Sequence, residues 1–191
     1  MKSNTFKEYI QPTVVLVIIC LVITFALAYV NSITAPIIAQ NTKASQDAAR
    51  AELLPAAENF EQYTGDLVVL SPDQVHVSDC YVGTNGEGIV ATVESKSYGG
   101  MLTAMVGIDN EGSVTGVQVT AHNDTMGLGT KAHDAGYLSQ YQGVTELAGA
   151  DNIKGDSAVT YISGATISSN ALYQVVCAAL QQYQEIQGGA N

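Results

Sequence analysis

The sequence predicts an α+β protein: a single N-terminal transmembrane helix followed by a domain with a mainly antiparallel sheet and packed helices. Three observations support this prediction. An uncharged apolar run lies near the start, short strand-like segments separated by turn sequences occupy the middle, and an amphipathic helical pattern closes the chain. At 191 residues the chain has room for one domain besides the apolar run.

The composition excludes several classes of protein. Apolar residues make up 47% of the chain, which is enough for a core and too many for a disordered protein. Charged residues make up only 13%, so part of the chain is expected to lie outside water. The net charge of −11 argues against nucleic-acid binding. The spacing of the cysteines (Cys20, Cys80 and Cys177) is not that of a disulfide scaffold. The cysteines and the histidines (His76, His122 and His133) also lack the spacing of a zinc site, so no metal is expected.

Residues 13–30 are predicted to form the transmembrane helix. The segment has 18 residues and no charge. As a helix it would span about 27 Å, close to the roughly 30 Å hydrocarbon core of a bilayer. Pro12 stands at a tolerated helix start, and Tyr9 and Tyr29 flank the run as interfacial aromatic residues do.

A cleaved signal peptide is the competing interpretation of this segment. Lys2 and Lys7 would form its basic region, and Ala26-Leu27-Ala28 resembles a cleavage site. The apolar run is longer than the usual core of a signal peptide, which favours an uncleaved membrane helix.

The positive-inside rule orients the chain. Lys2 and Lys7 precede the apolar run, and Lys43 and Arg50 follow it at a greater distance. This pattern places the N-terminus in the cytoplasm. The predicted organisation is a cytoplasmic N-terminus (1–12), the transmembrane helix (13–30), a connecting helical segment (31–66) and an extracytoplasmic domain (67–191). Outside the cell, Cys80 and Cys177 could pair or remain free.

Within the connecting segment, residues 36–54 have helix-forming composition. Pro36 suits the first turn of a helix, and Pro55 would stop it. We expect a spacer helix that starts at Pro36.

Beyond residue 67 the pattern changes to that of short strands and turns. Strands are predicted at 88–95, 101–108, 114–121 (interrupted by Gly116) and 157–162, turns at 84–87 and 109–112, and a short helix at 132–141. A final amphipathic helix ends near Gly188-Gly189, with apolar residues at helical spacing: Leu172, Val175, Val176, Ala179, Leu180, Tyr183 and Ile186.

Residues 163–169 form a small-residue loop between the last predicted strand and the last helix. A helix N-terminus offers free N–H groups and a positive dipole end to an anion, and Thr166 carries a hydroxyl beside it. From these residues alone, a plain turn with Ser168 or Ser169 as the N-cap is the preferred interpretation.

A second loop, residues 122–131, contains Gly127 and Gly129 two positions apart. This spacing indicates a backbone pressed against something flat or phosphorylated, although the third glycine of a dinucleotide-binding motif is missing. Lys131, considered alone, is expected to be a solvated lysine.

Together, the two loops resemble the FMN-binding domains of the RnfG and NqrC families. Ser163-Gly164-Ala165-Thr166 with Ser168 is similar to the flavinylation motif, and residues 106–129 resemble the upstream half of the same domain. The sequence departs from the usual pattern at Asp124 and Met126, where the families have Glu and Pro. The resemblance implies that a flavin transferase esterifies the Thr166 hydroxyl to the FMN phosphate. The implied binding residues are Ser163, Gly164, Ala165, Ser168, Thr125, Gly127, Leu128 and Gly129, with no separate catalytic residue.

The resemblance also implies a role. Members of the RnfG family carry electrons within a membrane-bound, ion-translocating ferredoxin:NAD⁺ oxidoreductase, the Rnf complex, so other redox and membrane subunits are the implied partners. Residues 13–30 contain no ionisable side chain to serve as an ion path, so partner subunits would form the pump. Alternatives are an NqrC-like subunit of a sodium-translocating quinone reductase, a free-standing flavinylated electron shuttle, and a non-enzymatic pilin-like or sensor module.

Overall fold

A computed structural model describes residues 10–148 and 152–188 of the chain. The chain divides into two units, Met1–Asp47 and Ala48–Asn191. The first unit consists of most of helix α1 (Gln11–Leu53). This helix is long and apolar enough to cross a membrane, with a mean hydropathy of 2.9 over its most apolar stretch, of which none is buried within the protein. The apolar side chains of this stretch are exposed, Phe25 for example with 74% of its surface.

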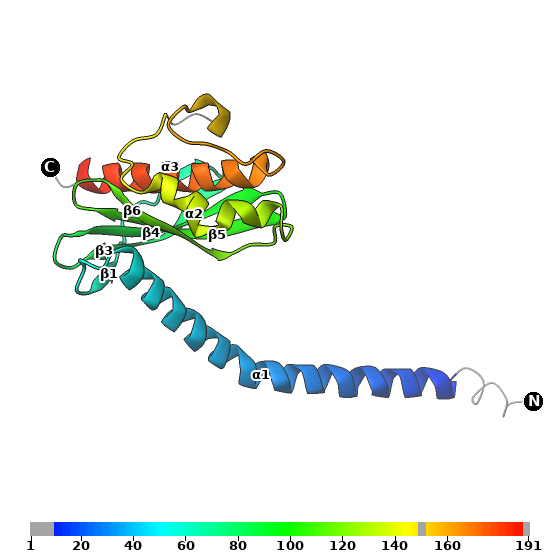
Figure 1. Cartoon of the computed structure of the whole chain (residues 1–191). Coiled ribbons are helices and arrows are strands. Elements are labelled where there is room, and N and C mark those ends of the chain that lie inside the picture. The colour runs from blue at the N-terminus through cyan, green and yellow to red at the C-terminus, as the bar shows by residue number, and fades with distance from the viewer. Residues whose placement is uncertain (1–9, 149–151, 189–191) are drawn as a thin grey trace, which may run out of the picture. The chain divides into compact units, whose positions relative to one another are not determined.

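The expectation that a separate helix starts at Pro36 was wrong. Helix α1 is continuous (Figure 1), and Pro36 lies inside it. A proline inside a helix removes one backbone hydrogen bond at a cost of about 3 kcal/mol, and the helix continues because the flanking residues still form their own bonds. Pro55 acts as expected, since the helix ends two residues before it, at Leu53.

The second unit is built on an antiparallel sheet. Its order is β1-β3-β4-β5-β6, with the short β2 paired to β3. The strands are β1 (Phe60–Gln62), β2 (Val69–Ser71), β3 (Val75–Gly83), β4 (Gly88–Ser97), β5 (Gly100–Asp109) and β6 (Val114–Ala121). Strands β4 and β5 pair along their whole length, from Gly88 opposite Asp109 to Ser97 opposite Gly100. The turn between them therefore lies at residues 98–99.

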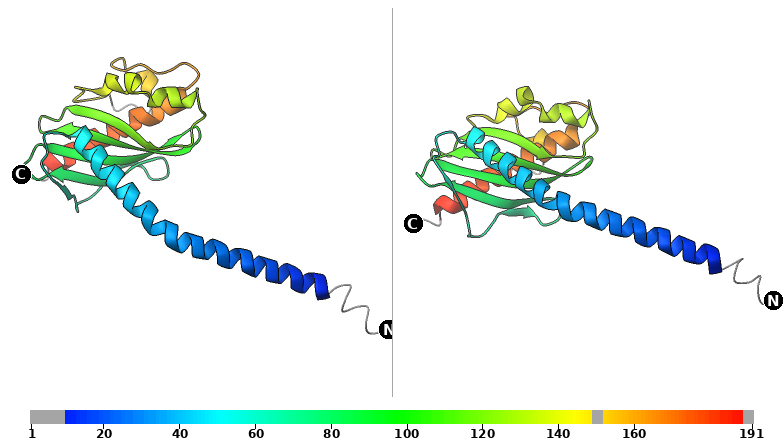
Figure 2. Two further views of the ribbon diagram at one scale, coloured as in Figure 1. Left: turned by 60° about the horizontal axis from the view of Figure 1, so that its bottom comes forward. Right: turned by 90° about the horizontal axis from the view of Figure 1, so that it is seen from below.

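Each face of the sheet is covered. Helix α3 (Thr166–Gly188) lies along one face, and the last turn of α1 lies on the other (Figures 1 and 2). Strand β4 contributes to both layers, since Ile89 belongs to the cluster under α3 and Val90 to the cluster under α1. This explains why β4 is a near-continuous apolar run instead of an alternating one. Among its described residues the unit also has the short helical turns η2 (Gly129–His133), α2 (Ala135–Leu138), η3 (Ser139–Tyr141) and η4 (Ile153–Gly155).

The α+β class, the antiparallel sheet and the closing helix are confirmed. The strands predicted at 88–95, 101–108 and 114–121 are all present. Gly116 lies beside a shift in the register of the β5–β6 pairing, although β6 continues through it. It makes room for Leu53, whose Cδ2 atom would lie 3.1 Å from a Cβ at this position. The helix predicted at 132–141 is instead divided into the short turns η2, α2 and η3.

The strand predicted at residues 157–162 was wrong. Side chains satisfy the backbone of this segment, so it has no need of a neighbouring strand. The carboxylate of Asp156 accepts from the Ala158 N–H, and the Gln140 side chain accepts from the Thr160 N–H, each at 2.8 Å. The Tyr137 hydroxyl donates to the Thr160 carbonyl.

Candidate functional site

The small-residue loop before α3 is a tight turn over residues 162–165. The Ala165 N–H donates to the Ile162 carbonyl at 2.9 Å, and Gly164 has a φ of +87°. A side chain at that φ is strained, so glycine is the residue that this turn requires. The turn delivers the chain directly into the first residue of α3, Thr166.

The second loop contains a turn of the same kind over residues 125–128. The Leu128 N–H donates to the Thr125 carbonyl at 3.2 Å, and Gly127 has a φ of +74°. The Gly127 N–H also donates to the Thr130 hydroxyl at 2.9 Å. Both glycine loops therefore use a glycine at the third position of a turn.

Gly129 is required for a different reason, which is close packing. A Cβ at this position would lie 2.9 Å from the Asp124 Cβ and 2.9 Å from the Ser168 Oγ. Only a residue without a side chain lets the 122–131 loop approach the first turn of α3 this closely. The sequence indicated a backbone pressed against something flat or phosphorylated, whereas the neighbours of Gly129 in the structure are Asp124 and Ser168.

Ser168 and Ser169 are not N-caps, contrary to the interpretation preferred from the residues alone. The helix starts at Thr166, and both serines are buried within its first turn. The Ser169 hydroxyl accepts from the Ile162 N–H at 3.1 Å, while the Ser168 hydroxyl bonds to the carboxylate of Asp124. Each serine thus ties the helix start to one of the two loops.

These loops enclose a pocket of about 460 Å³ at the N-terminus of α3. The structure brings together seven of the nine predicted site residues there, whereas Ser163 and Gly127 do not line it. The lining residues are Tyr98, Thr125, Leu128, Gly129, Gly164, Ala165, Thr166, Ile167 and Ser168. An adjacent pocket of about 470 Å³ shares Tyr98, Thr166 and Ile167, and Lys96 lines its wall.

Thr166 stands where these two pockets meet. Its side chain is half-buried, and within the described part of the chain its hydroxyl has no hydrogen-bond partner. The first backbone bond of α3 runs from the Ser169 N–H to the Ala165 carbonyl at 2.9 Å. The N–H groups of residues 166–168 therefore remain available, and with the positive end of the helix dipole they favour an anion. A hydroxyl next to an anion site and an apolar wall suits a flavin phosphate ester.

Asp124 holds the 122–131 loop against the turn between β4 and β5. Its carboxylate is buried and accepts from the Ser97 hydroxyl at 2.6–2.8 Å and from the Gly99 N–H at 2.9 Å. The His133 Nε2 lies 3.1 Å from the same carboxylate. Burial opposes ionisation, but the hydrogen bonds from Ser97, Gly99 and Ser168 outweigh it and hold the pKa of Asp124 below its usual value.

Two residues of this site had no assigned role in the sequence prediction. Ser97 precedes the loop by about 25 residues, and His133 follows it. No pattern in the sequence marks them, because only the fold brings them to Asp124. Gly99 belongs to the Tyr98-Gly99-Gly100 segment, for which the sequence indicates a structural role as a bulge or a pocket wall. Gly99 has its own steric reason to be glycine, since a Cβ there would lie 2.0 Å from the Asn123 carbonyl oxygen.

In residues 10–148 and 152–188, no group of three or more His, Cys, Asp or Glu side chains is arranged to hold a metal ion. Cys20, Cys80 and Cys177 form no disulfide in the structure, so Cys80 and Cys177 are not paired with each other.

Two family models match the chain. One describes an FMN-binding domain and matches residues 97–181, which include every residue lining the 460 Å³ pocket. The other describes the RnfG N-terminal region and matches residues 1–53. The fold and the site thus define a flavin-binding domain preceded by an apolar N-terminal helix.

Relatives over the full length narrow this class. A subunit of the ion-translocating oxidoreductase complex of Methanosarcina acetivorans is 30% identical, over 95% of this chain and 98% of its own. The corresponding subunit of the Na⁺-translocating ferredoxin:NAD⁺ oxidoreductase complex of Acetobacterium woodii is 28% identical, over 95% of this chain and 94% of its own. Its counterpart from the proton-translocating complex of Clostridium ljungdahlii is 29% identical, over 91% of each chain. The chain belongs to the RnfG family, as the sequence motifs indicated.

Among solved structures, NqrC of Shewanella oneidensis matches with a TM-score of 0.46 and 19% identity, over 72% of this chain and 73% of its own.

Proposed function

We propose that this chain is an electron-transfer subunit of a membrane-bound, ion-translocating ferredoxin:NAD⁺ oxidoreductase and carries FMN as a phosphoester of Thr166. The observation that carries the proposal is the Thr166 hydroxyl, which lies without a partner among the described residues, at the N-terminus of a long helix and at the edge of an apolar pocket. FMN accepts and donates one or two electrons when it is bound, so the chain needs no acid, base or metal of its own.

The residues around Thr166 divide into those that suit a phosphate and those that suit a ring system. The free N–H groups at the start of α3 would hold the phosphate, and the positive charge of Lys96 in the adjoining pocket would favour it further. Tyr98, Leu128 and Ile167 supply apolar surface for the flavin ring. Because 72% of Tyr98 and 54% of Ile167 are exposed, the site stays open to a redox partner.

The apolar stretch of α1 would hold the chain in the cell membrane, with the N-terminus in the cytoplasm and the flavin domain outside. The uneven distribution of lysines supports this orientation. Ion translocation would then belong to partner subunits, because residues 13–30 contain no ionisable side chain. A flavin transferase on the same side of the membrane would attach the FMN.

The decisive experiment is co-expression of the full chain with a flavin transferase. We expect in-gel flavin fluorescence after denaturation and an intact mass increased by one FMN less one water. The T166V variant keeps the shape of the side chain and removes the hydroxyl, so it should lose both. T120V is the matched control because Thr120 is an exposed threonine of β6 that does not line the pocket, and it should stay fluorescent. Fluorescence that persists in T166V, or a native chain without added mass, would refute the attachment site.

A second experiment separates an Rnf subunit from a free-standing flavin shuttle, an NqrC-like subunit and a pilin-like or sensor module. The native chain is expected to co-purify with membrane redox subunits that include a ferredoxin- or NAD-dependent partner. Relatives similar over more than 90% of this chain that are themselves named as complex subunits support this expectation. A flavinylated chain that purifies alone from mildly solubilised membranes would favour the shuttle, and a colourless one the module.

A further inference from the structure

His133 and Asp124 form a buried pair directly behind the attachment pocket. Their side chains are 8% and 1% exposed, and the distance from Nε2 to Oδ2 is 3.1 Å. Asp124 is also bonded to Ser168, in the first turn of the helix that starts at Thr166. A change of charge at Thr166 therefore acts on a helix turn that is linked to His133 through Ser168 and the buried Asp124 carboxylate.

The second ring nitrogen of His133 is the unusual feature of this pair. Because the Asp124 carboxylate accepts hydrogen bonds, Nε2 must carry the hydrogen. The Nδ1 atom is buried and has no hydrogen-bond partner among the described residues. In the neutral ring the Nδ1 atom carries a lone pair that accepts no hydrogen bond. Protonation would turn Nδ1 into a buried N–H group without an acceptor.

The surroundings of His133 disfavour a positive charge as long as no anion is attached. Burial lowers the pKa of His133, and so does His122, whose ring centroid is 4.4 Å away; the carboxylate of Asp124 opposes both. The titratable groups that act on the ring are Asp124 and His122 in the preceding loop and Asp134 on its own segment; Glu52, at the end of α1, lines the same cleft. Residues 166–172 of α3 contribute none, but the helix adds the positive end of its dipole.

We propose that His133 takes up a proton when Thr166 carries the FMN phosphate, so that the imidazolium balances two neighbouring anions, the phosphodiester and Asp124. The inference rests on the proposed function. The phosphodiester adds one negative charge and cancels the positive helix end, and both changes favour the protonated ring. Water supplies the proton, and no bond other than this N–H forms.

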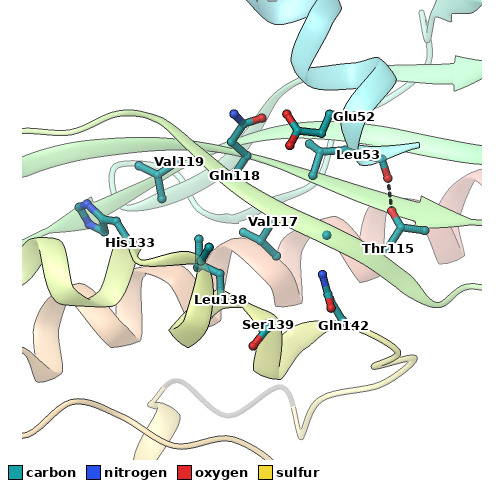
Figure 3. A pocket seen from close by; sticks show the side chains of 12 residues that line it. Glu52, Leu53, Thr115, Val117, Gln118, Val119, His133, Leu138, Ser139 and Gln142 are labelled. Atoms are coloured by element: carbon teal, nitrogen blue, oxygen red, sulfur yellow. Dashed lines mark hydrogen bonds between the residues drawn. The ribbon is translucent and has the colours of Figure 1, made fainter. Parts of the chain in front are cut away.

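A cleft gives the proton a route to His133. It has a volume of about 370 Å³ and lies between the edge of β6, the last turn of α1 and the η2–η3 segment. Figure 3 shows His133 at one end of this cleft, with Gln142 and Thr115 toward the other. His133 thus lines this cleft, while its partner Asp124 is held by the Gly99 N–H in the turn beside the flavin pocket.

The test is the pKa of His133 in the native full chain, solubilised in detergent and labelled at histidine, with and without the transferase. The chain has three histidines, so the NMR signal of each can be assigned as the one that is lost in the variant H133Q, H122Q or H76Q. If one variant does not fold, its signal is the one that the other two variants leave unassigned. An opposite charge at 4–6 Å raises a histidine pKa by about 1–3 units, and for this more distant phosphate we expect a rise of roughly half to one unit. His76, paired with Glu94 on the β3–β4 ladder at 3.7 Å, should not move.

The outcomes are distinct. A pKa that rises for His133 and stays constant for His76 supports the inference. If the mass of the chain shows the adduct and the pKa of His133 is unchanged or lower, the inference is wrong and the proposed function stands. If no adduct forms on the native chain, the proposed function fails and this inference fails with it.

Discussion

Replacing Asp124 with alanine removes an acceptor that four donors share. The donors are the hydroxyls of Ser97 and Ser168, the N–H of Gly99 and the ring of His133. A buried donor without an acceptor costs about 1–3 kcal/mol, and water that enters the vacated space recovers part of this. We therefore expect D124A to lower the free energy of unfolding by about 3–5 kcal/mol.

The D124N variant separates the loss of the acceptor from the loss of the charge. An asparagine keeps one oxygen for Ser97 and Gly99, and its amide group can donate to the Nε2 of the other His133 tautomer. We expect a loss of only about 1–2 kcal/mol, because charged acceptors bind more strongly than neutral ones.

Guanidinium unfolding of the full chain in detergent, followed by the near-ultraviolet circular dichroism of its ten tyrosines, measures both values. If D124A and D124N are equally stable, and both lie within about 1 kcal/mol of the native chain, Asp124 does not organise the site. In-gel flavin fluorescence of the same variants tests the consequence for the pocket, and we expect D124A to be flavinylated much less than D124N.

Three further predictions concern other parts of the domain. Because folding lowers the pKa values of both His133 and Asp124, the free energy of unfolding should fall as the pH drops below about 6.5 and again as it drops below about 3.9. In acid-unfolding curves, H133Q should lack the first of these two declines. G129A should lower the free energy of unfolding by about 1–3 kcal/mol by overpacking, whereas G136A, with open space at its Cβ, should not, as urea titrations would reveal. Burial raises the pKa of the Cys80 thiol to about 12, so iodoacetamide at pH 8 should leave Cys80 unmodified in the folded chain and label it after unfolding in guanidinium; labelling of Cys80 without denaturant would contradict its burial.

The elements that the sequence predicted well are those with a strong local pattern. The apolar run, strands β4 and β5 and the closing helix each carry a pattern that their own residues decide. The failures occur where distant side chains act. Gln140, 20 residues away, satisfies the backbone at Thr160, and nothing within 157–162 reveals this.

The site was predictable in part for the same reason. Thr166 and the two glycine loops are contiguous motifs, so a family resemblance can identify them. The roles of Ser97 and His133 depend on one carboxylate that meets both after folding. Gly127 and Gly129 look alike in the sequence, yet the first is required by a positive φ and the second by a steric contact.

The adjacent serines at the start of α3 have a consequence for the energetics of cofactor attachment. Ser169 fixes the preceding turn and Ser168 fixes the opposite loop, so the walls around Thr166 are already ordered in the bare polypeptide. Little conformational entropy then remains to be lost when the nucleotide arrives, and the unmodified and modified domains should have nearly superimposable backbones.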